Sequence, residues 1–141
     1  MGERLFKGTW SVGPFHCYPF RLVGRGSHTI LHSHEHDHMV SADRPIAVYR
    51  MGKDGEDEVI PIAANDRRLI AAHTEHLIVA LYHGITDCEC LFSRYDGHGD
   101  FLADPKETSR QPYREPCDPA NLPPLVLEYL ARDHGVTPSD I

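Results

Sequence analysis

Short apolar runs separated by turn residues are the feature that most restricts the fold of this chain. They recur at spacings of roughly 8–12 residues between positions 5 and 95, with no helical periodicity until late in the chain. Turn residues interrupt them, as in the segments 24–26 and 52–55. We expect strands within 5–23 and at 27–33, 39–42, 46–51, 59–64, 68–72, 77–83 and 89–95. This pattern is typical of an all-β sandwich or barrel.

The character of the chain changes after residue 96. Prolines recur from Pro105 to Pro124 and predict an irregular, extended segment. One short helix is expected at 123–133, with Leu127 and Leu130 on its apolar stripe and Gly135 as its stop. We therefore expect a β-barrel over 1–96 and a C-terminal extension over 97–141 that packs on the barrel or on a partner subunit. The proline content also allows a disordered tail.

Length and charge exclude several classes of function. The 141 residues are 40% hydrophobic and 25% charged, as expected for one soluble globular domain. The net charge of -7 argues against nucleic acid as a partner, because phosphate binding requires a basic surface. The N-terminus has no apolar signal segment, and no apolar run approaches the length of a membrane span. We expect a cytoplasmic protein that binds neither nucleic acid nor membrane.

The four cysteines match no zinc or redox spacing. They are Cys17, Cys88, Cys90 and Cys117, and the closest two are separated by one residue rather than two. Reduced thiols are the favoured interpretation, and a disulfide or metal chemistry is the alternative.

Histidines concentrate in one stretch of the chain. Five of the eleven lie between positions 28 and 38, namely His28, His32, His34, His36 and His38. Neutral imidazole is the commonest metal ligand, and alternate residues of a strand point to one face, so His32 and His34 share a face. A second pair, His73 and His76, comes at the entry to a later strand. Facing strands of a small barrel can bring such imidazoles around one divalent ion.

The first cluster resembles the first motif of the cupin family, Gly-x5-His-x-His-x3–4-Glu-x6-Gly. Its positions are occupied by Gly26, His32, His34, His38 and Pro45. The chain departs from the motif twice, since His38 stands where the family usually has glutamate and Pro45 where it has glycine.

The second cluster resembles the second cupin motif, Gly-x5-Pro-x-Gly-x2-His-x3-Asn. Its positions are occupied by Asn65, Ala71, His73, His76 and Ala80, so the likeness depends largely on the histidine of the motif. The chain thus resembles a single-domain cupin over about 26–80 by motif and 5–95 by strand count. The resemblance implies a cupin-type double-stranded β-helix, the jelly-roll barrel.

The resemblance also implies a metal site made of imidazoles alone. Its ligands would be His32, His34, His38 and His76, with Fe(II) or Mn(II) favoured and Ni(II), Zn(II) or Cu(II) as alternatives. By strand alternation His36 and Asp37 point away from this site, and His73 is expected at the turn near its mouth. His28 has the strand parity of His32, which allows a place behind the ligands.

Parity with the ligands predicts the lining of a substrate pocket. The expected residues are Val40, Ala42, Tyr49, Ile78, Ala80 and Tyr82, with Val48 as the alternative to Tyr49. Tyr82 as a polar group and Glu75 as the nearest acid are the candidates for a catalytic role. Arg21 and Arg50 can clamp an anionic substrate, although surface roles are the simpler interpretation.

Four imidazoles leave two positions open on an octahedral ion, and many single-domain cupins are dioxygenases. We therefore expect a metal-dependent oxygenase that acts on a small organic molecule. An isomerase or lyase of the same fold and a non-catalytic metal- or ligand-binding cupin are the alternatives, because fold alone does not decide function. We expect a homodimer, since pairing through the sheets covers exposed strand edges.

Overall fold

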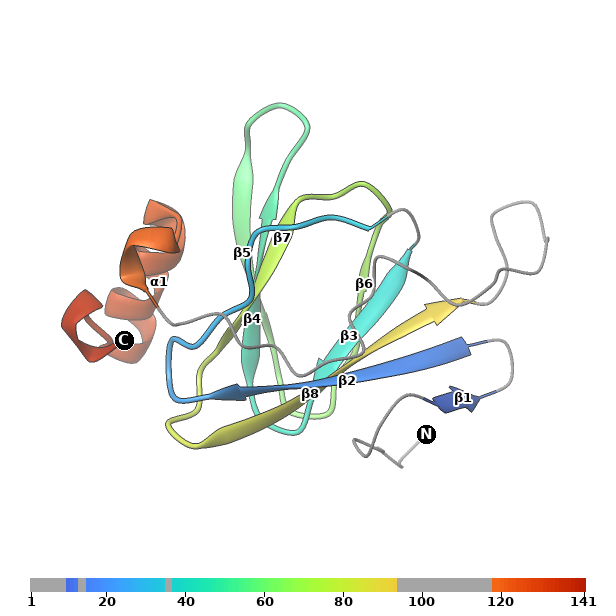
Figure 1. Cartoon of the computed structure of the whole chain (residues 1–141). Coiled ribbons are helices and arrows are strands. Elements are labelled where there is room, and N and C mark those ends of the chain that lie inside the picture. Colours follow the sequence, from blue (N-terminus) through green and yellow to red (C-terminus); the bar gives the residue numbers. More distant parts are fainter. Residues whose placement is uncertain (1–9, 13–14, 35–36, 94–117) are drawn as a thin grey trace.

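The computed structural model of the chain is a barrel of two facing antiparallel β-sheets with one α-helix outside it (Figure 1). The structure describes residues 10–12, 15–34, 37–93 and 118–141. One sheet has the strand order β1-β2-β8-β3-β6 and the other β5-β4-β7. The strands are β1 (Trp10–Val12), β2 (Phe15–Val23), β3 (His38–Ala42), β4 (Ile46–Met51), β5 (Asp57–Ile62), β6 (Arg68–Ile70), β7 (His76–Ala80) and β8 (Ile85–Ser93).

This architecture confirms the all-β jelly-roll barrel expected from the sequence. Seven of the expected strand regions coincide with strands of the structure, within a few residues at each end. The exception is 27–33, which forms no named strand and instead runs along β7 through two isolated bridges, one at His28 and one at His32.

Strand β7 and the first four residues of β4 are buried on both faces. Val48 and Ile78 point into the barrel and join its interior core, whereas their neighbours Tyr49 and Leu77 join a second core on the outer face. Val48 lies directly opposite Ile78 in the sheet, and Tyr49 lies directly opposite Leu77. A strand covered on both sides needs no polar alternation, which explains the continuous apolar runs at 46–49 and 77–80.

The outer core is closed by the helix α1 (Pro124–His134). Val126, Tyr129 and Leu130 form its buried stripe and pack in the same cluster as Tyr49. Gly135 ends the helix in the left-handed conformation, φ 65°, and lets Val136 donate a hydrogen bond back to the Leu130 carbonyl (3.0 Å). The C-terminal part of the chain thus packs on the barrel, while the boundary expected at 96 and the proline-rich stretch before 118 lie outside the described residues.

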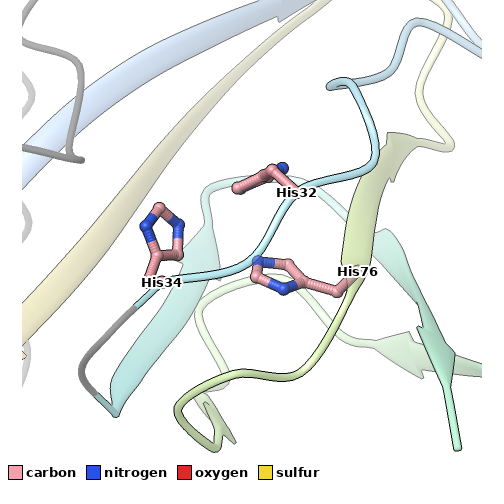
Figure 2. A group of neighbouring side chains, drawn as sticks. All are labelled: His32, His34 and His76. Carbon is pink, nitrogen blue, oxygen red and sulfur yellow. The ribbon is translucent and has the colours of Figure 1, made fainter.

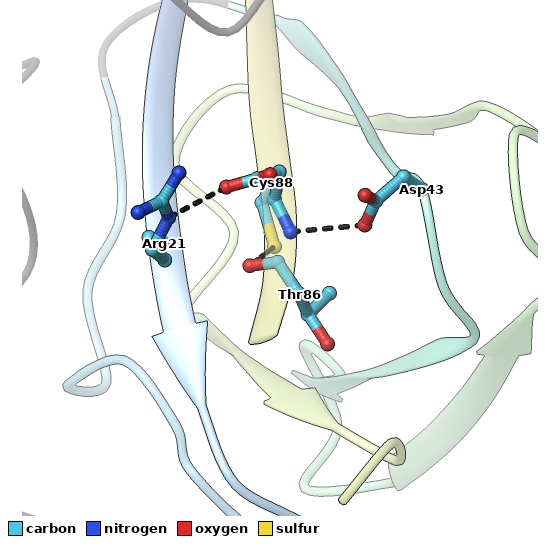
Figure 3. Close-up of polar contacts among 5 residues, drawn as sticks. Arg21, Asp43, Thr86 and Cys88 are labelled. Carbon is cyan, nitrogen blue, oxygen red and sulfur yellow. Dashed lines mark hydrogen bonds and ion pairs between the residues drawn. The ribbon is translucent and has the colours of Figure 1, made fainter. Parts of the chain in front are cut away.

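The barrel has two ends, which we call the mouth and the base. The mouth is the end at which β3 and β7 begin, and the base is the end at which they finish. Polar contacts tie the base together (Figure 3): the Asp43 carboxylate accepts a hydrogen bond from the Asp87 amide (2.9 Å), and Arg21 donates to the Asp87 side chain (2.7 Å). None of the helices in the described ranges has the length and apolar character needed to cross a bilayer.

Candidate metal centre

Three histidines from two segments meet at the mouth of the barrel. One nitrogen from each of His32, His34 and His76 lies within 4.8 Å of the others. Figure 2 shows the three imidazoles gathered around a common space, two from the segment before β3 and one from the first residue of β7. His76 is fully buried, and the other two are half-buried. The structure thus brings together three of the four residues that the sequence assigns to a metal.

A register shift between the 27–34 segment and β7 determines which histidines reach this space. His28 pairs with Val79 and His32 with His76, so four residues on one side match three on the other. One extra residue is therefore inserted, as in a β-bulge, and it reverses the alternation of side chains. The Ile78 amide, displaced by this insertion, donates to the Thr29 hydroxyl at 2.9 Å.

The shift corrects the expected place of His28. Val79 belongs to the outer core, whereas His76 is on the face of Ile78, inside the barrel. His28 consequently faces away from His32 although the two residues have the same parity in the sequence. It is buried at 2% exposure, and its Nδ1 lies 3.0 Å from the Thr29 carbonyl.

Backbone carbonyls orient two of the imidazoles. His32 Nδ1 lies 2.7 Å from the Ile30 carbonyl, and His76 Nδ1 lies 2.7 Å from the Thr74 carbonyl. A carbonyl only accepts, so each Nδ1 carries the proton and each Nε2 keeps its lone pair. His76 Nε2 is buried and has no hydrogen-bond partner among the described residues. Burial lowers the pKa of His76 to about 4, so the imidazole is neutral near pH 7 and available as a ligand.

His38 adjoins this cluster from β3. Its ring centroid lies 4.7 Å from that of His34 and 5.1 Å from that of His76, and its side chain is 2% exposed. The inner face of β3, which also carries Val40 and Ala42, directs it into the barrel. Two of its neighbours are thus imidazoles at ring-contact distance.

The loop before β7 is held against the histidine segment. The His73 amide donates to the His34 carbonyl (2.8 Å), and the Asp37 carboxylate accepts the Ala72 amide (2.7 Å). The His73 side chain is exposed, which agrees with a turn position rather than a ligand. The Asp37 side chain is exposed, and through this hydrogen bond it has a structural role that the sequence did not indicate. His36 lies outside the described residues.

Backbone conformation supports the alignment with the second cupin motif. Asn65 (φ 68°) and His73 (φ 62°) are the non-glycine residues with positive φ in the described ranges. Both stand where the motif has glycine, the residue that adopts this conformation without a steric cost. Gly26, at the first position of the first motif, also has a positive φ of 87°.

The residues fit a divalent transition metal. An imidazole nitrogen lies about 2.0–2.1 Å from a bound Zn(II), so two ligands of one ion are at most about 4.2 Å apart. The 4.8 Å span of the cluster therefore closes with a small rotation of the side chains. Imidazole suits zinc, copper, iron and nickel, and it gives the site no charge of its own.

Below the histidines the barrel is filled with apolar side chains. Val40, Ala42, Ile78 and Ala80, all expected to line a pocket, belong to the interior core. The buried thiols of Cys88 and Cys90 lie in the same core, where burial raises the pKa of Cys90 to about 12. Cys117 lies outside the described residues.

The expectation for Tyr49 was wrong. Its ring belongs to the outer core beneath α1, and its hydroxyl donates to the Asp57 carboxylate at 2.5 Å. Burial and this contact raise the pKa of Tyr49 to about 12. Val48 takes the inward position.

The two candidate catalytic residues differ in their position relative to the cluster. Tyr82 follows β7 six residues after His76, a separation of about 20 Å in extended chain, and therefore belongs to the base. There its ring contacts the Arg44 guanidinium, 4.4 Å from the ring centroid, and the His83 ring. Glu75 is adjacent to His76, but its side chain is exposed.

No protein-family model and no curated protein sequence matches this chain. Among solved structures it is similar to a cupin 2 domain-containing protein of Halorhodospira halophila, with 24% identity, a TM-score of 0.51 and coverage of 66% of each chain. Hazelnut (Corylus avellana) vicilin gives 7% identity and a TM-score of 0.52 over 67% of this chain and 25% of the vicilin. The cysteine peptidase Peruvianin-I of Thevetia peruviana gives 18% identity and a TM-score of 0.51 over 64% of this chain and 56% of the peptidase.

These likenesses define the class of protein by fold alone. The three proteins differ in kind, and the present chain spans two thirds or less of each. The arrangement of strands that they have in common, together with the histidine cluster, establishes a cupin fold with residues able to hold a metal ion. Its function has to be argued from the site.

Proposed function

We propose that the protein is a metal-dependent cupin oxygenase whose divalent ion is held by His32, His34, His38 and His76. The observation that carries the proposal is the convergence of His32, His34 and His76 on one space, with the His38 ring beside them and the buried His76 Nε2 lacking a hydrogen-bond partner in the described part of the chain. A buried polar nitrogen without a partner is costly, and a metal ligand bond is one way to satisfy it.

The chain supplies orientation and a dry environment at this site. The Ile30 and Thr74 carbonyls fix the rings of His32 and His76 with Nε2 toward the common space. The interior core excludes water from one side of the cluster. A bound Fe(II) or Mn(II) would supply redox chemistry on a small organic substrate.

The surroundings favour an oxygenase over an isomerase or lyase. Isomerases and lyases commonly use a side chain that moves a proton, and the interior core of the described residues consists of aliphatic, aromatic and cysteine side chains. Tyr82 lies at the base, and the Glu75 side chain is exposed to solvent. A non-catalytic metal-binding cupin is the second candidate, favoured by the same dense core, which leaves any ligand only the mouth.

Metal analysis followed by oxygen consumption tests the proposal. We expect about one divalent ion per chain by mass spectrometry, and loss of that ion in His34→Ala and His76→Ala. Oxygen uptake by the Fe(II)-loaded protein in the presence of candidate substrates separates the oxygenase from the non-catalytic alternative. A purified protein that binds none of Fe(II), Mn(II), Ni(II), Zn(II) and Cu(II) would refute both the oxygenase and the non-catalytic metal-binding cupin. The homodimer and the cytoplasmic location stay predictions.

A further inference from the structure

We propose that the ligand of this site is a small carboxylate, held by the Arg50 guanidinium beside the metal. The inference rests on the proposed metal centre and names the class of molecule that the centre would accept. It comes from a row of side chains across the mouth, formed by residues that are far apart in the sequence.

The row is defined by the strand register. His32 pairs with His76, His76 pairs with Arg50, and Arg50 pairs with Glu58. The side chains of residues directly opposite each other lie on one face of a sheet, with Cβ atoms about 4.5–5.5 Å apart. The four residues therefore form one line across the inner face: two imidazoles, a guanidinium and a carboxylate.

Arg50 occupies an inward position that is open at the mouth. Along β4 it follows Ile46 and Val48, which both point into the interior core. Its side chain is nevertheless 47% exposed, because β4 reaches the mouth at this point. Because Arg50 is on the inner face of β4, its Cβ lies beside His76. Because its side chain is exposed, the guanidinium is accessible to a ligand that enters from solvent.

Glu58 holds the guanidinium without using all of its donors. Arg50 Nη2 makes an ion pair with Glu58 Oε1. A guanidinium has five N–H donors arranged as a fork, so the others remain able to bind a carboxylate in bidentate fashion. Holding the side chain in place reduces the entropy lost when a ligand binds.

The charge at the mouth favours an anion. Neutral imidazoles leave the two positive charges of a divalent ion uncompensated, and Arg50 adds a third while Glu58 removes one. Glu75, the residue before His76, alternates to the other face and is exposed. Asp57, at the start of β5, is engaged by the Tyr49 hydroxyl on the outer side.

The next row of side chains limits the size of the ligand. Val48 and Ile78 lie one step deeper on the same face and are both 1% exposed. The ligand is thus confined to the mouth, with one end on the metal and its carboxylate on Arg50. A planar carboxylate with an adjacent oxygen atom matches this arrangement better than an apolar molecule, which would need a cavity.

Binding of pyruvate to the Co(II)-loaded protein tests the inference, followed through the absorption spectrum of the metal. Pyruvamide, which has the same shape without the charge, is the matched ligand control. We expect pyruvate to bind at least about tenfold more tightly than pyruvamide, and Arg50→Gln to abolish this preference. Arg50→Lys, which keeps the charge but loses the fork, should retain part of it. Arg21→Gln, which removes an exposed strand arginine at the base, should leave it unchanged.

Metal content measured on the same samples separates the two levels of the argument. A wild-type protein that takes up neither Co(II) nor any of the five metals named above would refute the metal centre and this inference together. Full Co(II) occupancy with the same pyruvate affinity in wild type and Arg50→Gln would refute the carboxylate site alone, as would equal binding of pyruvate and pyruvamide.

Discussion

A bound divalent ion is expected to stabilise the fold, and His32→Ala is expected to remove that stabilisation. The ion would join the histidine segment to β7, whose direct contact consists of two isolated bridges and a few backbone hydrogen bonds. A ligand that binds only the folded state at a concentration 100 times its dissociation constant contributes about 2.7 kcal/mol. For a chain of this length about 1 kcal/mol corresponds to about 2–4 °C, so the melting temperature should rise by about 5–11 °C.

Thermal unfolding with and without Zn(II) measures this rise in melting temperature. Two histidine variants test whether the rise comes from the proposed metal centre. The His32 side chain is half-buried and has one described hydrogen bond, to the Ile30 carbonyl, so its removal should cost the metal-free protein about 1 kcal/mol. His28 is the matched control, because it is four residues away but faces the outer core. His28→Ala should lower the melting temperature of the metal-free protein and keep the full rise with Zn(II). If His28→Ala abolished the rise and His32→Ala preserved it, the register argued here would be wrong.

Three further predictions address the loop, its support and the core. His73→Gly should stabilise the protein by about 0.5–1 kcal/mol in urea unfolding, because left-handed backbone costs a non-glycine residue about 1–2 kcal/mol and glycine loses part of that gain through unfolded-state entropy. Asp37→Ala should weaken Zn(II) binding about tenfold by calorimetry, since the carboxylate holds the loop that contacts His34. Cys90, whose pKa is raised from 9.0 to about 12 by burial and then by the Glu89 charge, should resist iodoacetamide in the native protein at pH 8. As the pH rises, the Cys90 thiol loses its proton in the unfolded state before it does so in the folded state. The free energy of unfolding should therefore fall from pH 9 to pH 12, and fall less in Cys90→Ala.

The sequence was sufficient for the fold and for most of the histidine site. Evenly spaced short strands predict a barrel, and the offsets of His32, His34 and His76 predict that they approach one another. Asn65 and His73 have the left-handed backbone conformation that suits the glycines of the second motif, although neither residue matches it by type.

Alternation along a strand failed where both faces of a strand are apolar or where the chain inserts a residue. In β4, Val48 and Tyr49 are equally suited to burial, and only the position of α1 decides which core each one joins. In the 27–34 segment the extra residue places His28 on the opposite face from His32. The one trace of this insertion in the sequence is Thr29, whose hydroxyl accepts the hydrogen bond from the Ile78 amide. Neither outcome follows from local pattern, because a partner element determines both.

The row across the mouth shows the same dependence on partners, with a consequence for function. Arg50 appears in the sequence as a strand arginine with surroundings similar to those of Arg21, and nothing in its neighbours separates the two. Strand pairing does separate them: Arg21 lies opposite Asp87 at the base, whereas Arg50 lies between His76 and Glu58 at the mouth. Motif offsets can locate the residues that hold an ion. The residues that select its ligand are placed by register between strands, and register is determined only when the sheets assemble.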